Sequence, residues 1–137
     1  MPAPTGPMSL FNLAQRGMSA QLVRMNAAAS NLANAGSVAG SAEATYRPLR
    51  PVFATSLDAA NGLATVDVAA VVRSQVAPVK EYNPDHPLAD ADGNVWSSPV
   101  NENAEMVEML EASRQYQNLV EAMSTAKQLM LDTLRVK

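Results

Sequence analysis

Apolar residues recur at spacings of three and four near both ends of the chain, and this pattern constrains the fold more than any other feature. Within residues 8–36 the stripe is interrupted by Gln15, and its members are Phe11, Met18, Leu22, Met25, Ala29 and Leu32. Within residues 101–137 the stripe consists of Met109, Ala112, Tyr116, Leu119, Met123, Ala126 and Met130. This period is typical of helices that pack in a coiled-coil-like manner. We therefore predict two long terminal helices that pair with each other along these stripes.

Local signals mark the ends of both predicted helices. Ser9 is a suitable N-cap for the first helix. Asn34 and Gly36 suit its C-terminal end, because both residue types tolerate the left-handed conformation that ends helices. Asn101 is a suitable N-cap for the second helix. Acidic residues follow this cap and basic residues lie near the other end, so the charges complement the helix dipole.

The face of the first helix opposite its stripe is poor in charge. Only 17% of all residues are charged, against about 25% in average domains. Between Met8 and Gly36 the charged residues are Arg16 and Arg24, and the other polar positions are Asn, Gln and Ser mixed with Ala. A helix that faces water normally carries interspersed Lys and Glu. The pattern favours contact with several neighbouring helices, although a core helix of one domain or a partly ordered segment would have the same composition.

The middle of the chain, residues 37–100, carries signals of extended structure and turns. Each Pro within residues 46–54 favours an extended conformation for the residue before it. Valines within residues 66–72 predict a strand after the Asn61-Gly62 turn, and residues 76–82 are its expected neighbour. We expect a small β-rich insert between the helices, and therefore an α+β fold.

The chain divides accordingly into three predicted parts. Residues 1–7 contain three prolines and are expected to form a flexible tail. Residues 8–36 and 101–137 together form a terminal helical domain, and residues 37–100 form the insert. The first residues lack the basic start and apolar core of a secretory signal.

The richest cluster of potential catalytic or metal-binding residues lies in one loop and comprises Asp85, His86, Asp90 and Asp92. When Gly93 is aligned with the glycine of a calcium-binding loop, Leu88 and Pro99 occupy the two outer ligand positions. The chain has one His and no Cys, and it lacks the motifs of nucleotide binding or nucleophilic catalysis. We predict a loop stiffened by its prolines, with no cofactor and no enzymatic activity. A metal-dependent protein that uses this loop is the alternative.

Charge and methionine content bear on the partners. A net charge of −3 with scattered basic residues argues against a nucleic-acid partner, and no motif indicates a small-molecule substrate. The methionines other than Met1 lie in the two predicted helices, which is typical of adaptable helix–helix packing. A soluble helical adapter or chaperone that presents a Met-rich groove to a client would share this feature.

Three segments resemble one family, the axial proteins of the bacterial flagellum. Residues 26–35 resemble the N-terminal signature that rod and hook proteins share, with matching positions at Asn26, Ser30, Asn31, Leu32 and Asn34. Residues 83–93 resemble a loop of the proximal rod proteins, with matching positions at Pro84, His86, Pro87, Asp90 and Gly93. Residues 105–117 and 125–134 resemble the C-terminal helix of the same proteins, with matching positions that include Glu105, Met106, Glu111, Ser113, Arg114 and Gln117.

This resemblance implies a structural subunit of the proximal flagellar basal-body rod, a helical tube that crosses the periplasm and transmits torque. It implies passage through the flagellar type III export apparatus without a cleaved signal peptide. The implied partners are other copies of the chain, other proximal and distal rod proteins, and the basal-body adapter protein at the base of the rod. The two stripes and the motif at residues 26–35 are then expected to form helix and subunit interfaces. Another proximal rod protein of similar length is the alternative within the family.

Overall fold

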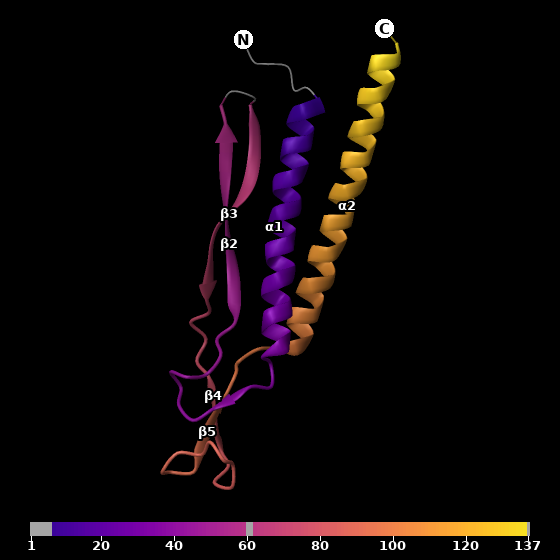
Figure 1. Cartoon of the computed structure of the whole chain (residues 1–137). Coiled ribbons are helices and arrows are strands. Elements are labelled where there is room, and N and C mark those ends of the chain that lie inside the picture. Colours follow the sequence, from indigo (N-terminus) through magenta and orange to yellow (C-terminus); the bar gives the residue numbers. More distant parts are fainter. Residues whose placement is uncertain (1–6, 60–61, 137) are drawn as a thin grey trace.

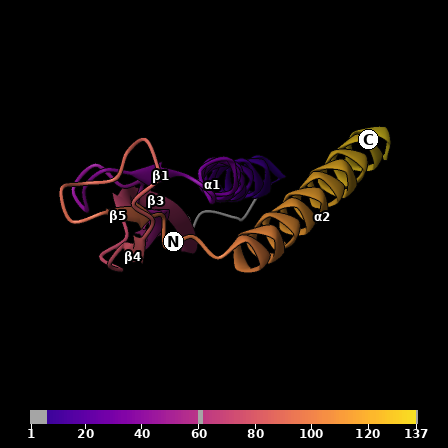
Figure 2. The ribbon, with the colours of Figure 1, turned by 90° about the horizontal axis from the view of Figure 1, so that it is seen from below.

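Two long antiparallel helices form the largest part of the structure (Figure 1). The computed structural model of the protein describes residues 7–59 and 62–136. Helix α1 spans Pro7–Ala33 and helix α2 spans Glu102–Arg135. The two helices pack against each other, with the end of α1 beside the start of α2, and α2 is tilted relative to α1 (Figure 2). The predicted pair of terminal helices is therefore confirmed.

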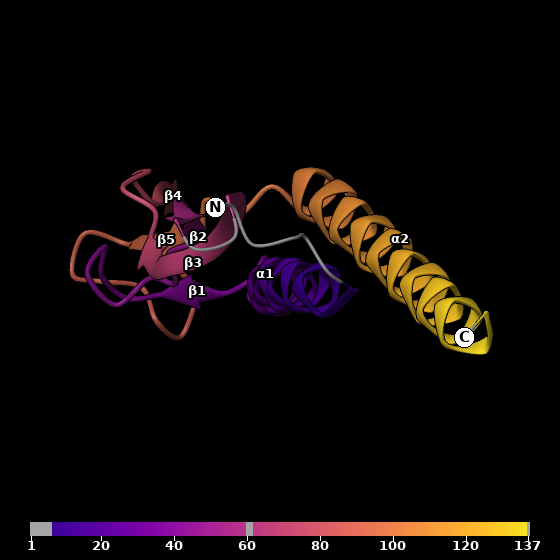
Figure 3. The same ribbon diagram turned by 90° about the horizontal axis from the view of Figure 1, so that it is seen from above.

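Strands β2 (Leu49–Asp58) and β3 (Leu63–Arg73) form a long antiparallel hairpin. Leu49 pairs with Arg73 at its base, and the register shifts between Val52 and Phe53. The hairpin runs along α1, on the side of α1 that faces away from α2 (Figures 1 and 3). Helix α1 therefore lies between the hairpin and α2 and contacts both.

Three shorter strands form a second sheet beyond the end of α1. Strands β1 (Val38–Ala39), β4 (Val79–Tyr82) and β5 (Asn94–Ser97) are antiparallel and lie in the order β1-β5-β4. Val95 of β5 is almost completely buried. This sheet occupies the lower end of the molecule in Figure 1, and a short connection leads from β5 to α2. The predicted α+β fold with a small central β region is confirmed.

The pairing of β3 differs in part from the prediction. The expected strand at residues 66–72 lies within β3 and is confirmed. The expectation that residues 76–82 pair with it is wrong, because β3 pairs with β2 whereas β4 pairs with β5. The connection between Asp58 and Leu63 is short, and Gly62 within it has a φ of 66°. Such a connection folds β3 directly back on the strand that precedes it.

The N-cap predictions for the two helices have opposite outcomes. Helix α1 begins at Pro7, so Ser9 lies inside the helix and the prediction that it is the N-cap is wrong. Proline suits the first helical position because its missing N–H would have no helical partner there. The N-cap prediction for α2 is confirmed, since the Asn101 side chain accepts a hydrogen bond of 3.1 Å from the N–H of Ala104. Of the predicted tail, Pro7 belongs to α1 and residues 1–6 lie outside the described residues.

Helix α1 ends at Ala33, and its C-terminal end is capped by a different interaction from the one expected. In the described part of the chain, the residues with a positive φ angle are Gly62 and Gly93. The prediction that Asn34 or Gly36 ends the helix in a left-handed conformation is therefore wrong. Instead the Asn34 side chain donates a hydrogen bond of 2.8 Å to the carbonyl of Ser30. A side chain thus satisfies one of the last carbonyl groups of the helix.

Small residues occupy the buried apolar positions of the two helices. The buried apolar residues of the helices are all alanines: Ala14, Ala20, Ala27 and Ala28 on α1, with Ala112 and Ala126 on α2. Gly17 also faces α2, because a Cβ atom there would lie 3.0 Å from Cδ1 of Leu119. Small side chains at a contact allow the two helix axes to approach closely. This close packing brings the end of α1 next to the start of α2.

Candidate functional site

The two predicted stripes are only partly buried in the single chain. On α2, Ala112 and Ala126 are buried, and the other members of the stripe are half-buried. On α1, Leu22 is 43% exposed and Ala29 is also exposed, whereas the other members are half-buried. Apolar surface therefore remains accessible after the helices have paired. Its role in contacts between subunits stays a prediction.

The motif at the end of α1 places Asn31 within a buried polar cluster, and Asn31 is 0% exposed. Its Oδ1 accepts hydrogen bonds from the N–H of Leu49 at 2.7 Å and from the hydroxyl of Tyr46 at 2.8 Å. Its Nδ2 donates to the carbonyl of Leu49 at 3.0 Å and to Oε2 of Glu105 at 3.1 Å. Asn31 therefore joins α1 to the start of β2 and to the first turn of α2.

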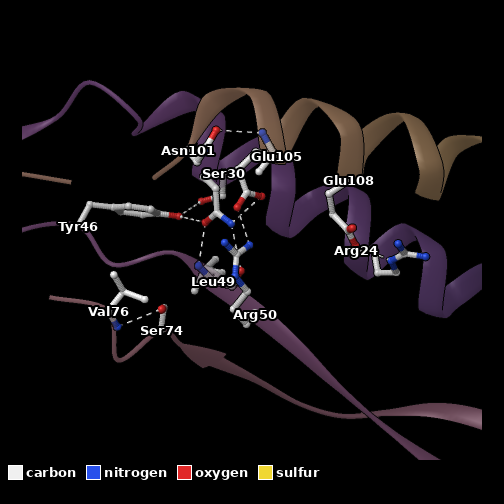
Figure 4. A network of polar contacts seen from close by, with 12 residues as sticks. Arg24, Ser30, Tyr46, Leu49, Arg50, Ser74, Val76, Asn101, Glu105 and Glu108 are labelled. Carbon is white, nitrogen blue, oxygen red and sulfur yellow. Dashed lines mark hydrogen bonds and ion pairs between the residues drawn. The ribbon is translucent and has the colours of Figure 1, made fainter. Parts of the chain in front are cut away.

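Glu105 is the second buried polar residue of this cluster and is 1% exposed. Its Oε1 forms an ion pair with Nη1 of Arg50, while its Oε2 accepts the hydrogen bond from Asn31. Figure 4 shows Arg50 reaching Glu105 from the strand below the helices. Because both carboxylate oxygens have partners, the charge of Glu105 is accommodated in the interior.

Tyr46 and Ser30 complete the cluster. Their hydroxyl oxygens are 2.9 Å apart and form a hydrogen bond, and Figure 4 shows the Tyr46 ring pointing toward Ser30. The guanidinium of Arg73 lies 5.5 Å from the centre of the Tyr46 ring, which is within the range of cation–π attraction. We refer to one set of residues as the clasp: Ser30, Asn31, Tyr46, Arg50 and Glu105, with the main chain of Leu49. The clasp connects α1, the hairpin and α2.

The two arginines of α1 reach in opposite directions. Nε of Arg24 lies 2.7 Å from Oε1 of Glu108 on α2 (Figure 4). Nη1 of Arg16 donates a hydrogen bond of 2.9 Å to Oγ1 of Thr65 and lies 3.6 Å from Oδ2 of Asp67, both on β3. Both charges of α1 are therefore engaged within the chain, which leaves the rest of its surface neutral.

The loop between β4 and β5 uses its polar side chains to hold its own backbone. Oδ1 of Asp90 accepts hydrogen bonds from the N–H groups of Asp92 at 2.9 Å and Asn94 at 2.8 Å. Nδ1 of His86 accepts a hydrogen bond of 3.0 Å from the N–H of Leu88. In the described residues, no group of three or more His, Asp or Glu side chains is arranged to hold a metal ion. Asp90 and His86 thus stabilise the backbone of this loop.

Gly93 is required at the end of this loop for two reasons. Its φ is 80°, a conformation that residues with a Cβ rarely adopt. A Cβ atom there would lie 2.9 Å from Cε2 of Tyr82 and 3.1 Å from Cβ of Pro84. The motif residues Pro84, Asp90 and Gly93 therefore shape the turn, and Pro87 is exposed beside them.

Except for Glu105, the C-terminal motif lies largely on the outer surface of α2. A shallow hollow on this helix is lined by Val107, Leu110, Glu111, Ser113, Arg114 and Gln117. Met106 is exposed nearby, and Leu110 is 69% exposed. Large exposed apolar side chains continue toward the end of α2 at Val120, Leu129, Leu131 and Leu134. Neither of the two described helices is long and apolar enough to cross a membrane. An exposed apolar surface of this extent is typical of an interaction site.

Tyr46 and Arg50 are clasp residues whose role cannot be recognised from the sequence. They lie in a segment for which only an extended conformation is predicted, and no motif marks them. Tyr46 is 15 positions from its partner Asn31 in the sequence. Only an indirect signal points to Arg50. If the amide of Asn31 and the carboxylate of Glu105 are buried, they require polar partners, and Arg50 is one of few cations in the insert.

Comparisons with known proteins agree on the family. Residues 11–40 match the family described as "Flagella basal body rod protein", and residues 91–136 match "Flagellar basal body rod FlgEFG protein C-terminal". These two regions contain Asn31 and Glu105, the two buried residues at the centre of the clasp.

Relatives from other bacteria align along nearly the whole chain. The chain is 45% identical over 129 residues to "Flagellar basal-body rod protein FlgC" of Salmonella typhimurium, which covers 93% of this chain and 95% of the relative. It is 39% identical over 127 residues to the protein of the same description from Yersinia enterocolitica, covering 93% and 95%. For that of Agrobacterium fabrum, the identity is 31% over 123 residues, covering 89% and 88%. The chain therefore belongs to the FlgC family of flagellar basal-body rod proteins.

Proposed function

We propose that this chain is a structural subunit of the proximal part of the flagellar basal-body rod. In this proposal it assembles with copies of itself and with other rod proteins into a helical tube that transmits torque. Membership of the FlgC family supports the proposal. The structural observation that carries it is the distribution of apolar side chains on the two helices, which are small at buried positions and often large at exposed ones.

The difference in size between buried and exposed apolar side chains indicates that neighbouring subunits cover the exposed ones. The buried apolar residues of the two helices are alanines, whereas Leu110 and Leu134 on α2 are 69% and 66% exposed. Fully burying one such side chain contributes about 1.5–3 kcal/mol. Contact with adjacent subunits would recover this free energy. When such contacts join different surfaces of two copies without closing a ring, they extend into a helical assembly.

The same proposal specifies partners and location. The partners are copies of the chain, other proximal and distal rod proteins, the adapter protein at the base of the rod, and the flagellar type III export apparatus. The location is the rod within the periplasm, reached without a cleaved signal peptide. The function is structural and involves no catalysis, which is supported by the relatives being flagellar basal-body rod proteins.

Substitution of Leu110 by Asp tests this proposal. The side chain of Leu110 is largely exposed, so the change should leave the fold and export intact and should block incorporation into the rod. Thr125→Asp, at an exposed polar position of the same helix, is the matched control. The measurements are the amount of tagged chain exported, its presence in purified basal bodies, and swimming in a strain that lacks the native gene.

Two results would refute the proposal. One is normal swimming and normal rods in the deletion strain. The other is a tagged chain that is absent from purified basal bodies and present in small soluble complexes, which is the result expected of a helical adapter or chaperone.

A further inference from the structure

The contacts between the hairpin and the two helices differ along the length of the hairpin. At its base, Arg50 and the main chain of Leu49 enter the buried clasp. Further along, both strands of the hairpin pack along α1, and Arg16 of α1 contacts Thr65 and Asp67 through a half-exposed guanidinium. Of the two ion pairs between the hairpin and the helices, the one at the base includes a buried carboxylate and therefore resists displacement more strongly than the exposed pair of Arg16 with Asp67.

Glu105 is the point at which all three elements meet. One oxygen of its carboxylate holds Arg50 of β2, and the other holds Asn31 of α1, while the residue itself belongs to α2. If the hairpin moved away from the helices, a charge that is 1% exposed would lose its cation. Leaving a buried charge unpaired is costly, so a single carboxylate resists movement of the hairpin relative to both helices.

We propose that Glu105 is a positioning residue that fixes the orientation of the hairpin relative to the helix pair. With the clasp closed, the hairpin stands at one defined position along α1. With the clasp open, the hairpin pivots about its base while the helices stay paired through their own contact, which includes that of Gly17 with Leu119. The consequence for assembly rests on the proposed function: a fixed hairpin meets a neighbouring rod subunit at a constant angle.

Distance measurements on the full chain test this positioning. The chain contains no cysteine, so nitroxide labels can be attached at Leu57→Cys near the hairpin tip and at Ala122→Cys on α2, both exposed positions. Pulsed electron paramagnetic resonance should give one narrow distance distribution when the clasp is intact. Glu105→Gln keeps the size of the side chain and removes the charge that pairs with Arg50. It should broaden the distribution and raise amide exchange in β2 and β3 about tenfold, with helix content unchanged.

Glu108→Gln is the matched control. It removes the neighbouring ion pair with Arg24, which joins α1 to α2 without involving the hairpin, so the distribution should stay narrow. Arg50→Gln is the second test variant, because it opens the clasp from the exposed side, and it should reproduce the effect of Glu105→Gln.

Three results would overturn the proposal. They are a narrow distribution in both clasp variants, a broad distribution in the chain with an intact clasp, and a loss of helix in both variants that accompanies any broadening. These measurements use the isolated full chain, so they succeed or fail independently of whether the chain enters basal bodies, which tests the proposed function.

Discussion

Substitution of Asn31 by Ala tests the energetic importance of the clasp. The change removes hydrogen bonds to three neutral groups, which are the N–H and carbonyl of Leu49 and the hydroxyl of Tyr46, and one hydrogen bond to the carboxylate of Glu105. A neutral hydrogen bond contributes about 0.5–1.5 kcal/mol to stability, and one to a charged group about 1.5–3 kcal/mol. Tyr46 and Glu105 keep one partner each, so we expect the free energy of unfolding to fall by about 3–5 kcal/mol.

Urea unfolding of the full chain measures this loss. The transition is followed by circular dichroism for the helices and by the fluorescence of Trp96 for the central sheet. Asn26→Ala is the matched control, because Asn26 is an exposed residue of the same helix and its substitution should change the free energy by less than about 0.5 kcal/mol. A loss of less than about 1 kcal/mol for Asn31→Ala would show that solvent replaces these bonds, which would refute the reasoning.

The remaining predictions concern the loop, the cap of α2 and metal ions. Gly93→Ala should lower the free energy of unfolding by about 1–3 kcal/mol in urea titrations; Gly36→Ala, where a Cβ would meet nothing within 4 Å, should not. Asn101→Ala should lower it by about 1 kcal/mol through loss of the N-cap, whereas a similar loss for the exposed Asn103→Ala would contradict this assignment. Added calcium or zinc should leave Tm unchanged, because Asp90 already binds two backbone N–H groups; a Tm that rises with ion concentration would show a metal site.

The helices could be predicted from the sequence because their signals are local. The apolar period and the N-cap at Asn101 each depend on residues a few positions apart. The partner of β3 was predicted wrongly for the same reason. Two segments flank residues 66–72, and choosing between them required knowing that β2 continues to Asp58 and turns back at once. Propensity alone does not contain that information, because Pro51 weakens the strand signal of β2.

The clasp could be predicted only in part. Ser30, Asn31 and Glu105 stand out through their resemblance to family motifs, but the sequence does not show that they meet. Their convergence depends on how closely α1 and α2 approach, which is determined in three dimensions by small residues such as Gly17. For a related reason, the large apolar residues of the stripes are less buried than their apolar character predicts. The side chains that pack most tightly between the helices are small, so a pattern of large apolar residues does not identify them.

The sequence separation of the clasp residues has a consequence for the order of folding. Asn31 and Glu105 are 74 positions apart, and contacts between such distant residues form only after a large loop has closed. Helix α1 and the hairpin are built from shorter-range contacts and are complete in the chain before Glu105 is reached. A chain that emerges from its N-terminus therefore carries Asn31 and Arg50 without their shared carboxylate until α2 begins to appear. Asn31 and Arg50 can bind Glu105 only after α2 has emerged. The closure of the clasp is therefore a late step in folding.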